Sequence, residues 1–339
     1  MMYTRIILRR IAGALPALVG VLIVTFFLTR ALPGDPAAYL AGPAAGGQAI
    51  EEIRVSLGLD RSYIEQFGLY LRDLSQGNLG ASWSTGQPVL IELTRRFPAS
   101  MELTLFGLLI TMTFAVPLGI ASALKPNSPI DHAARVISTI GVSLPTFFMG
   151  LLLLYIFYYL LGIAPGPTGR LSLFTQAPPG VTGFYLVDSL LAGRPRVFLE
   201  ALRYLFLPAL TLGLFALAPM TRMTRASMMK VLSSDYIRTA RANRIPRRKV
   251  IYLYALRNAI IPVLTTLGMV FSFLLGANVL VEKVFSWPGI GSYALEALII
   301  SDYAAVQGFV LLMGILYVLV NLLIDVLYIV LDPRVRVDS

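Results

Sequence analysis

The sequence predicts an all-α integral membrane protein with six transmembrane helices. Apolar residues make up 57% of the 339 residues and charged residues only 14%, well below the roughly 25% of a soluble domain. Six stretches without Lys, Arg, Asp or Glu are long enough to cross a hydrocarbon core of about 30 Å. Because lipid offers the backbone no hydrogen bonds, these stretches should be helices. They are Ile11–Leu28, Leu103–Leu124, Val136–Ala164, Tyr204–Thr221, Asn258–Val281 and Tyr303–Ile324.

The first span is expected to be a retained anchor and not a signal peptide. Its apolar run of about 18 residues exceeds the 7–15 residues of a signal-peptide core, and the following Leu32-Pro33-Gly34-Asp35-Pro36 is a poor cleavage site. The spans divide the chain into four parts. Residues 1–30 form a cytoplasmic N-terminus and the first span, 31–100 an external cap, 101–330 the core with the other five spans, and 331–339 a cytoplasmic tail.

The external segment 31–100 is too long for a plain loop. Its pattern predicts helices near Ala49–Leu57 and Ser62–Leu74, followed by a glycine-rich stretch through Gly77 and Gly80. Pro88 suits the first position of a further short helix, because the N–H that it lacks would have no partner there. We expect these helices to pack as a small cap.

Prolines interrupt or bend several of the spans. The third span should end near Leu161, because a Pro-Gly-Pro run follows Ala164. Pro117, Pro145 and Pro262 lie inside spans. Each frees a backbone carbonyl, and either marks a functional bend or produces a static kink.

The distribution of Lys and Arg orients the spans, because positively charged loops remain in the cytoplasm. The loop Arg222–Arg257 contains ten basic residues and one acid, Asp235, a net charge of +9 against +10 for the whole chain. The N-terminus and the tail are also basic, whereas the segments between the other span ends carry few or balanced charges. We therefore expect both termini in the cytoplasm. The positive charge belongs to one loop, which argues against a nucleic-acid surface.

The chain lacks the residues of most catalytic and metal sites. It has no cysteine, a single histidine, His132, and no glycine-rich phosphate loop ending in Lys and Ser or Thr. We expect no enzyme activity, no metal and no cofactor on this chain, so that any ATP used must bind another polypeptide. The spans contain no row of acids that would mark an ion path. Glu102 and Asp325, near span ends, are either ion sites or ordinary boundary charges.

The most informative segment is the basic loop between the fourth and fifth spans. Asp235 suits the cap of a helix that begins at Tyr236, since a carboxylate accepts hydrogen bonds from free backbone N–H groups. Asn243 tolerates a left-handed conformation and can end that helix. Pro246 then suits the first turn of a second helix that leads into the fifth span.

The predicted short helix is basic on one side and apolar on a neighbouring strip. Arg238 and Arg241 fall on the basic side, with Ile237 and Ala240 on the strip. Charge alone fits a loop that rests on anionic lipid. The other interpretation is a rigid helix that docks into a partner protein and transmits motion.

Sequence resemblance favours the second interpretation. The residues Asp235-Tyr236-Ile237-Arg238-Thr239-Ala240-Arg241-Ala242 resemble the EAA loop of ABC importer permeases, in the dipeptide, oligopeptide and nickel branch. The likeness continues along most of the chain in the same order. Its further landmarks are Leu8-Arg9-Arg10, Pro33-Gly34-Asp35-Pro36, Gly77-Asn78-Leu79-Gly80, Pro117-Leu118-Gly119, Ser143-Leu144-Pro145, Ala255-Leu256-Arg257-Asn258-Ala259, Phe285-Ser286-Trp287-Pro288-Gly289, Asp325-Val326-Leu327-Tyr328 and Asp332-Pro333-Arg334-Val335-Arg336.

The resemblance implies a type I ABC importer permease fold (MetI-like) in the bacterial inner membrane. It implies a second, usually non-identical permease subunit, two ATPase subunits that hold ATP and Mg²⁺, and an external binding protein that delivers a di- or oligopeptide. Arg244 departs from the glycine common in the family, so we expect Asn243 to take the left-handed position. The resemblance assigns coupling to Asp235, Tyr236, Arg238, Thr239, Ala240, Arg241, Ala242, Asn243 and Arg244.

The substrate route is predicted less specifically. Ser143, Thr146, Ser272 and Asn278 are candidate lining residues, although Ser and Thr equally satisfy their own helix carbonyls. Trp287 either contacts the binding protein or anchors the chain at the membrane interface. A nickel-chelate or glutathione importer of the same family is the alternative function. From a different class, the alternative is a stand-alone channel or secondary transporter.

Overall fold

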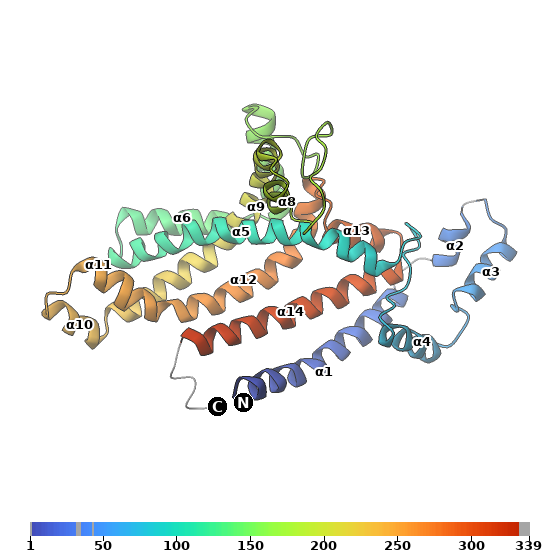
Figure 1. Ribbon diagram of the computed structural model, residues 1–339, viewed down its shortest axis with the longest axis horizontal. Coiled ribbons are helices and arrows are strands. Elements are labelled where there is room, and N and C mark those ends of the chain that lie inside the picture. The colour runs from blue at the N-terminus through green and yellow to red at the C-terminus, as the bar shows by residue number, and fades with distance from the viewer. Residues whose placement is uncertain (1, 32–34, 43, 332–339) are drawn as a thin grey trace. The chain divides into compact units, whose positions relative to one another are not determined.

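The computed structural model describes residues 2–31, 35–42 and 44–331 (Figure 1). Within these residues every regular element is a helix, apart from an isolated bridge between Ala81 and Pro88. The all-helical class predicted from composition is therefore confirmed for the described part of the chain. Packing divides the chain into two compact units, Met1–Pro98 with Pro288–Val318, and Ala99–Trp287 with Leu319–Ser339.

The first unit joins the N-terminal helices to a segment near the end of the chain. The predicted helices near Ala49–Leu57 and Ser62–Leu74 are both present. Ser62 and Glu65 form a reciprocal cap, in which each side chain accepts a hydrogen bond from the other residue's N–H, so two free N–H groups are satisfied. The helices are α1 (Met2–Ala31), α2 (Pro36–Ala41), α3 (Gly47–Ser56), α4 (Tyr63–Ser75), α13 (Ile290–Ile299) and the first part of α14 (Tyr303–Leu331).

The second unit is built from long helices around α9 (Pro195–Leu232), which packs against α6, α7, α8 and α12. Small residues allow close approach: a Cβ on Gly141 of α6 would lie 2.4 Å from the backbone oxygen of Leu214 in α9. The other elements are α5 (Val89–Leu124), which begins in the first unit, α6 (Pro129–Ser143), α7 (Thr146–Leu153), η1 (Leu154–Leu160), α8 (Tyr185–Leu191), α10 (Asp235–Ala242), α11 (Arg247–Lys249), η2 (Val250–Leu256) and α12 (Arg257–Val284).

Four or five of the six predicted spans appear as helices able to cross a membrane. Among the described residues, four helical stretches pass by length and apolar composition, and they contain the predicted second, fourth, fifth and sixth spans. The third span is a bent pair of helices, and the first lies in α1, of which Leu18–Ala31 is a shorter apolar helix. The four stretches are Val89–Leu124, Pro195–Leu232, Arg247–Val284 and Tyr303–Leu327.

The third predicted span is interrupted at Pro145, one of the three prolines at which the sequence predicts bends or kinks. α6 ends at Ser143, α7 begins at Thr146, and the two directions differ by 105°. Leu144 has extended backbone angles, φ −106° and ψ 140°, because the ring of Pro145 disfavours a helical conformation in the residue before it. Pro145 is the only one of the three span prolines that separates two helices in the described residues, since Pro117 and Pro262 lie inside α5 and α12.

The short helix predicted at Pro88 is instead the beginning of α5. The Pro88 carbonyl accepts hydrogen bonds from the N–H groups of Ile91 and Glu92, and the helix then continues for 36 residues through the second span. The charges in its first turns do not end it, because Glu92 and Arg96 form an ion pair of 2.9 Å on one helical face.

Candidate functional site

The short helix α10 of the basic loop begins on a local signal. Ser234 is the N-cap, with extended backbone angles of φ −74° and ψ 153°. The prediction that Asp235 caps the helix is therefore wrong by one residue, because Asp235 is its first helical residue. At that position its negative charge still interacts favourably with the positive, N-terminal end of the helix dipole. Arg238 Nη1 donates to the Asp235 carboxylate at 3.4 Å, and both side chains are exposed.

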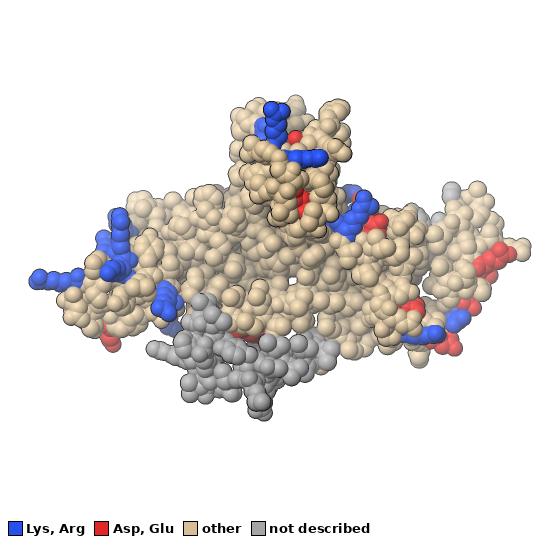
Figure 2. All heavy atoms as spheres, in the orientation of Figure 1, with Lys and Arg blue, Asp and Glu red and all other residues tan. Residues whose placement is uncertain are grey.

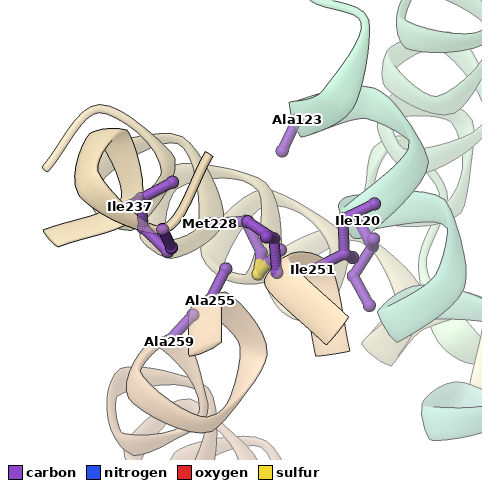
Figure 3. Packing of buried hydrophobic residues seen from close by; sticks show 9 residues of the cluster. Ile120, Ala123, Met228, Ile237, Ile251, Ala255 and Ala259 are labelled. Atoms are coloured by element: carbon purple, nitrogen blue, oxygen red, sulfur yellow. The ribbon is translucent and has the colours of Figure 1, made fainter. Parts of the chain in front are cut away.

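The apolar strip of α10 is confirmed. Ile237 is fully buried and Ala240 is 5% exposed. They join a hydrophobic cluster with Met228 of α9, Ile120 of α5 and residues of η2 and α12. In Figure 3, Met228 lies between Ile237 on one side and Ile120 on the other. The chain's own core therefore fixes the inner face of α10, so the helix cannot rotate or shift without disturbing the ends of α5 and α9.

The turn after α10 differs from the prediction. Asn243, expected to be left-handed, has φ −76° and ψ 12°, whereas Arg244 has φ +55°. The left-handed residue thus stands where the family that the sequence resembles commonly has glycine. A side chain there costs roughly 1–2 kcal/mol. The N–H of Arg244 donates to the Arg241 carbonyl at 3.0 Å, and Pro246 is the N-cap of α11 and not part of its first turn.

The face of α10 opposite the core is open to solvent. We call Asp235, Arg238, Thr239 and Ala242 the outer face; all four are exposed. Tyr236, at the edge of this face, is 45% exposed. Figure 2 shows Lys and Arg side chains gathered around α10 and α11. The exposed basic residues of the loop are Arg222, Lys230, Arg238, Arg241, Arg244, Arg247, Arg248, Lys249 and Arg257.

One arginine of the loop is used inside the chain. Arg225 of α9 donates two hydrogen bonds to the carboxylate of Asp131, at 2.7 and 2.9 Å. Asp131 is fully buried, and it also accepts from the Asn127 N–H and lies 3.4 Å from Arg135. This ion pair fastens the start of α6 to α9. Sequence reasoning missed it because the partners are 94 residues apart.

The candidate lining residues Ser143 and Thr146 flank the bend at Pro145. Ser143 is exposed, and its hydroxyl donates to the backbone carbonyl of Thr139, one turn earlier, at 2.7 Å. Thr146 is the first residue of α7 and is half-buried. The structure therefore brings these two residues to the same break, and their role in lining a path stays a prediction.

The other two candidates lie on α12 in different surroundings. Ser272 is half-buried. Asn278 is 2% exposed, and its amide donates to the Ser100 carbonyl at 3.1 Å and to the Thr104 hydroxyl at 2.8 Å. The amide nitrogen has thus found its partners on α5, whereas the buried amide oxygen accepts no hydrogen bond from the described residues. Nearby, the hydroxyl of Ser100 donates to the fully buried Glu282 carboxylate, so this polar cluster holds α5 and α12 together. A lining role for Ser272 and Asn278 also stays a prediction.

A buried ion pair accounts for Glu102, which the sequence left open as an ion site. Arg170 donates to Glu102 at 2.5 Å and to the Gly183 carbonyl at 2.9 Å, and its guanidinium lies 3.4 Å from the ring centroid of Tyr185. Both charged side chains are less than 10% exposed. Glu102 also accepts from the Leu186 N–H at 2.8 Å. It therefore ties the segment before α9 to α5.

Neither role predicted for Trp287 fits the structure. The side chain is 1% exposed, so it reaches neither lipid headgroups nor an external protein. Its indole N–H donates to the Ala99 carbonyl at 2.9 Å, and the guanidinium of Arg170 lies 5.8 Å from its ring. Trp287 is a buried side chain with its polar group satisfied, as buried tryptophans usually are.

These features define a class: a multi-pass helical membrane protein with an exposed basic helix on a loop. A family model, "Binding-protein-dependent transport system inner membrane component", matches residues 115–337. A second model, "Binding-prot-dependent transport system membrane comp, N-term", matches residues 2–104. The chain belongs to this family of transport permeases, which are not catalytic enzymes. Of the landmarks behind the sequence resemblance, Pro33, Gly34 and residues 332–336 lie outside the described residues.

Curated relatives agree with the family over almost the whole chain. The chain is 44% identical over 335 residues to the probable D,D-dipeptide transport system permease protein of Escherichia coli, covering 99% of this chain and 98% of the relative. It is 42% identical to the di/tripeptide transport system permease protein of Pseudomonas aeruginosa, and 40% identical to the dipeptide transport system permease protein of Alkalihalophilus pseudofirmus. These two alignments each cover 97% of this chain and 98% of the relative.

Proposed function

We propose that this chain is the permease subunit of an ATP-driven ABC importer and forms half of a translocation pathway for di- or oligopeptides. The three relatives are named for D,D-dipeptide, di/tripeptide and dipeptide transport. Their similarity to this chain extends from end to end, which supports the same substrate class here. The proposal includes six transmembrane helices in the type I importer arrangement, with α1 and the bent pair α6 and α7–η1 as the first and third.

The observation that carries the coupling role is the two-sided environment of α10. Ile237 and Ala240 fix its inner face in the core, whereas its outer face is exposed and carries Arg238. A helix that transmits force must be rigid toward its own chain and accessible to its partner. Arg side chains on that face can pair with carboxylates or with backbone carbonyls of an ATPase subunit. Movement of the ATPase subunits would then reach α5, α9 and α12 through the cluster around Met228.

The importer would contain the partners that the family implies. These are a second, non-identical permease subunit, two ATPase subunits and an external binding protein. ATP and Mg²⁺ would bind the ATPase subunits, with no cofactor on this chain. The basic loop Arg222–Arg257 supports a cytoplasmic location for α10 and for both termini in a bacterial inner membrane.

The alternatives are separated by substrate and by energy source. A nickel chelate or glutathione would be carried by the same kind of assembly, so identifying the ligand on the co-purified binding protein distinguishes these substrates from peptides. A stand-alone channel or secondary transporter would take up solute through this chain alone in proteoliposomes, without nucleotide. Glu102 forms a buried ion pair with Arg170. Its carboxylate is therefore already neutralised and does not serve as an ion-binding site on a path through the membrane.

The experiment tests the outer face and avoids the buried strip. Ala240 lies in the core, so Ala240→Glu would disturb folding. We expect Arg238→Glu combined with Ala242→Glu to reduce ATP-driven uptake by the reconstituted importer at least about tenfold. Membrane insertion and basal ATP hydrolysis should remain. Arg72→Glu, at an exposed arginine of α4, is the control for charge reversal outside the basic loop. Normal uptake in the double variant would count against a docking role for α10.

A further inference from the structure

A pocket of about 640 Å³ lies beside α10, within the second unit. It is open to solvent on one side and is bounded by the end of α5, the end of α9, one edge of α10, and the segment that leads into η2. Its lining residues are Ala123, Leu124, Pro126, Met229, Leu232, Ser233, Arg241, Ile245, Arg247, Val250 and Ile251. The pocket does not involve the outer face of α10.

The lining of this pocket combines an apolar floor with two cations and contains no acid. Arg241 and Arg247 are both exposed, and neither forms an ion pair with another described residue. Arg241 follows Ile237 by four residues, about one helical turn, so it lies on the side of α10 next to the core. Both arginines line the pocket, and none of the four residues of the outer face does.

Position along the chain favours a protein over lipid as the occupant. Ala123 and Leu124 end the second charge-free span, so the α5 side of the pocket lies at the boundary of the hydrocarbon core. Arg241, Ile245 and Arg247 lie on the loop that carries α10, and Arg241 is part of α10 itself. The pocket therefore adjoins the surface proposed to dock the ATPase, and a partner that meets α10 can also reach the two arginines.

We propose that this pocket receives a segment of an ATPase subunit that carries an apolar side chain flanked by carboxylates. The apolar side chain would lie on Met229, Val250 and Ile251, and the carboxylates would pair with Arg241 and Arg247. This inference rests on the proposed function and extends it. α10 is held from two sides, because its outer face enters the ATPase while a segment of the ATPase enters the permease. A two-sided grip would transmit both closing and opening movements.

Charge reversal at neighbouring arginines tests the pocket. Arg247 lines it and Arg248 does not, and both are exposed. We expect Arg247→Glu to weaken binding of the purified ATPase subunits to the permease in detergent by about tenfold or more. Arg248→Glu should change it by less than about threefold. Filling the pocket with Ser233→Trp should weaken binding as strongly as Arg247→Glu, without a change of charge.

Photo-crosslinking identifies the occupant in the intact complex. With benzoylphenylalanine at position 233, we expect a crosslink to an ATPase peptide that contains both apolar and acidic residues. A crosslink only to phospholipid, only to another permease chain, or to nothing would overturn the proposal. A second probe at Thr239 separates this failure from that of the proposed function. If the Thr239 probe captures the ATPase and the Ser233 probe does not, only the pocket assignment is wrong.

Discussion

The second unit holds its arginines in opposite ways at the two ends of residues 99–124, the part of α5 that it contains. Near the start of this part, Arg170 is 8% exposed and is held by Glu102 and the ring of Tyr185. Near the end of the helix, Arg241 and Arg247 are exposed beside a pocket that no acid lines. The first arginine stabilises the fold of the chain itself. The other two are available to a partner.

This contrast shows why counting positive charges does not locate a functional site. Arg225 belongs to the basic loop, yet it forms an ion pair with Asp131 that joins α6 to α9. The arginines of α10 and α11 have no comparable partner within the described chain, apart from the exposed contact between Arg238 and Asp235. Replacing an arginine should therefore affect stability at one end and assembly at the other.

The largest effect on stability is expected for Arg170→Ala. The substitution leaves the buried Glu102 carboxylate without its cation, and breaking such a pair costs about 3–5 kcal/mol. Thermal unfolding in detergent, followed by the fluorescence of Trp287 in a Trp83→Phe background, would measure the loss. Arg241→Ala is the comparison at the other end, and should change the free energy of unfolding by no more than about 0.5 kcal/mol. Equal losses in both variants would remove the distinction between the two ends.

A smaller loss of folding stability is expected for Gly141→Ala in the contact between α6 and α9. The added Cβ would lie 2.4 Å from the Leu214 backbone oxygen, so the helices must separate, at a cost of about 1–3 kcal/mol. Gly276→Ala in α12 is the control, because nothing lies within 4 Å of its added Cβ. The midpoint temperatures of the two variants should differ clearly. A Gly141→Ala midpoint as high as that of the control would show that the two helices are not tightly packed there.

In the turn after α10, a substitution should increase stability instead of lowering it. Arg244→Gly removes a side chain from a left-handed residue with φ +55°, and should stabilise the turn by about 1 kcal/mol. Amide hydrogen exchange in α10 should then slow by roughly fivefold if α10 opens together with the turn. Asn243→Gly is the control, since φ is −76° there and glycine brings only added flexibility. Faster exchange in Arg244→Gly would contradict the assignment of strain.

The smallest effect concerns acid stability near Arg170. Burial alone would raise the pKa of the Asp188 carboxyl, but hydrogen bonds from Thr182 and Gly183 outweigh it and lower the pKa. A lowered pKa means that stability is present above the unfolded value of about 3.9 and is lost as the pH falls through the folded value. Unfolding midpoints measured from about pH 6 to pH 3 should decline less in Asp188→Asn than in the original chain. Parallel curves would show that Asp188 does not contribute.

Much of the architecture could be predicted because it follows from local patterns. The charge-free runs define the long helices, and the signal Ser62 followed by Glu65 defines the start of α4. The apolar positions Ile237 and Ala240 predict the inner face of α10. Each of these inferences uses residues from one continuous stretch of the sequence.

The features that the sequence could not predict are of two kinds. Some depend on side chains that are far apart in the chain, and one depends on which of two adjacent residues adopts the left-handed conformation. Glu102 and Arg170 are 68 residues apart, so neither could be recognised as half of a pair. Trp287 looked like a surface anchor because its partner Ala99 is 188 residues away in the sequence. At the turn after α10, intrinsic preference favoured Asn243, but the core beneath the helix fixes its last turn and leaves Arg244 to reverse the chain.

The most direct test of the central claim uses the absence of cysteine from the chain. Ala242→Cys places a single thiol on the outer face of α10, where a thiol-specific benzophenone can be attached in native membranes. We predict that light will crosslink this position to an ATPase subunit. Mass spectrometry of the crosslinked protein would identify it as an ATPase from peptides that contain its phosphate-binding loop. Labelling of phospholipid alone, with no crosslinked protein, would contradict the account, because α10 would then rest on the membrane.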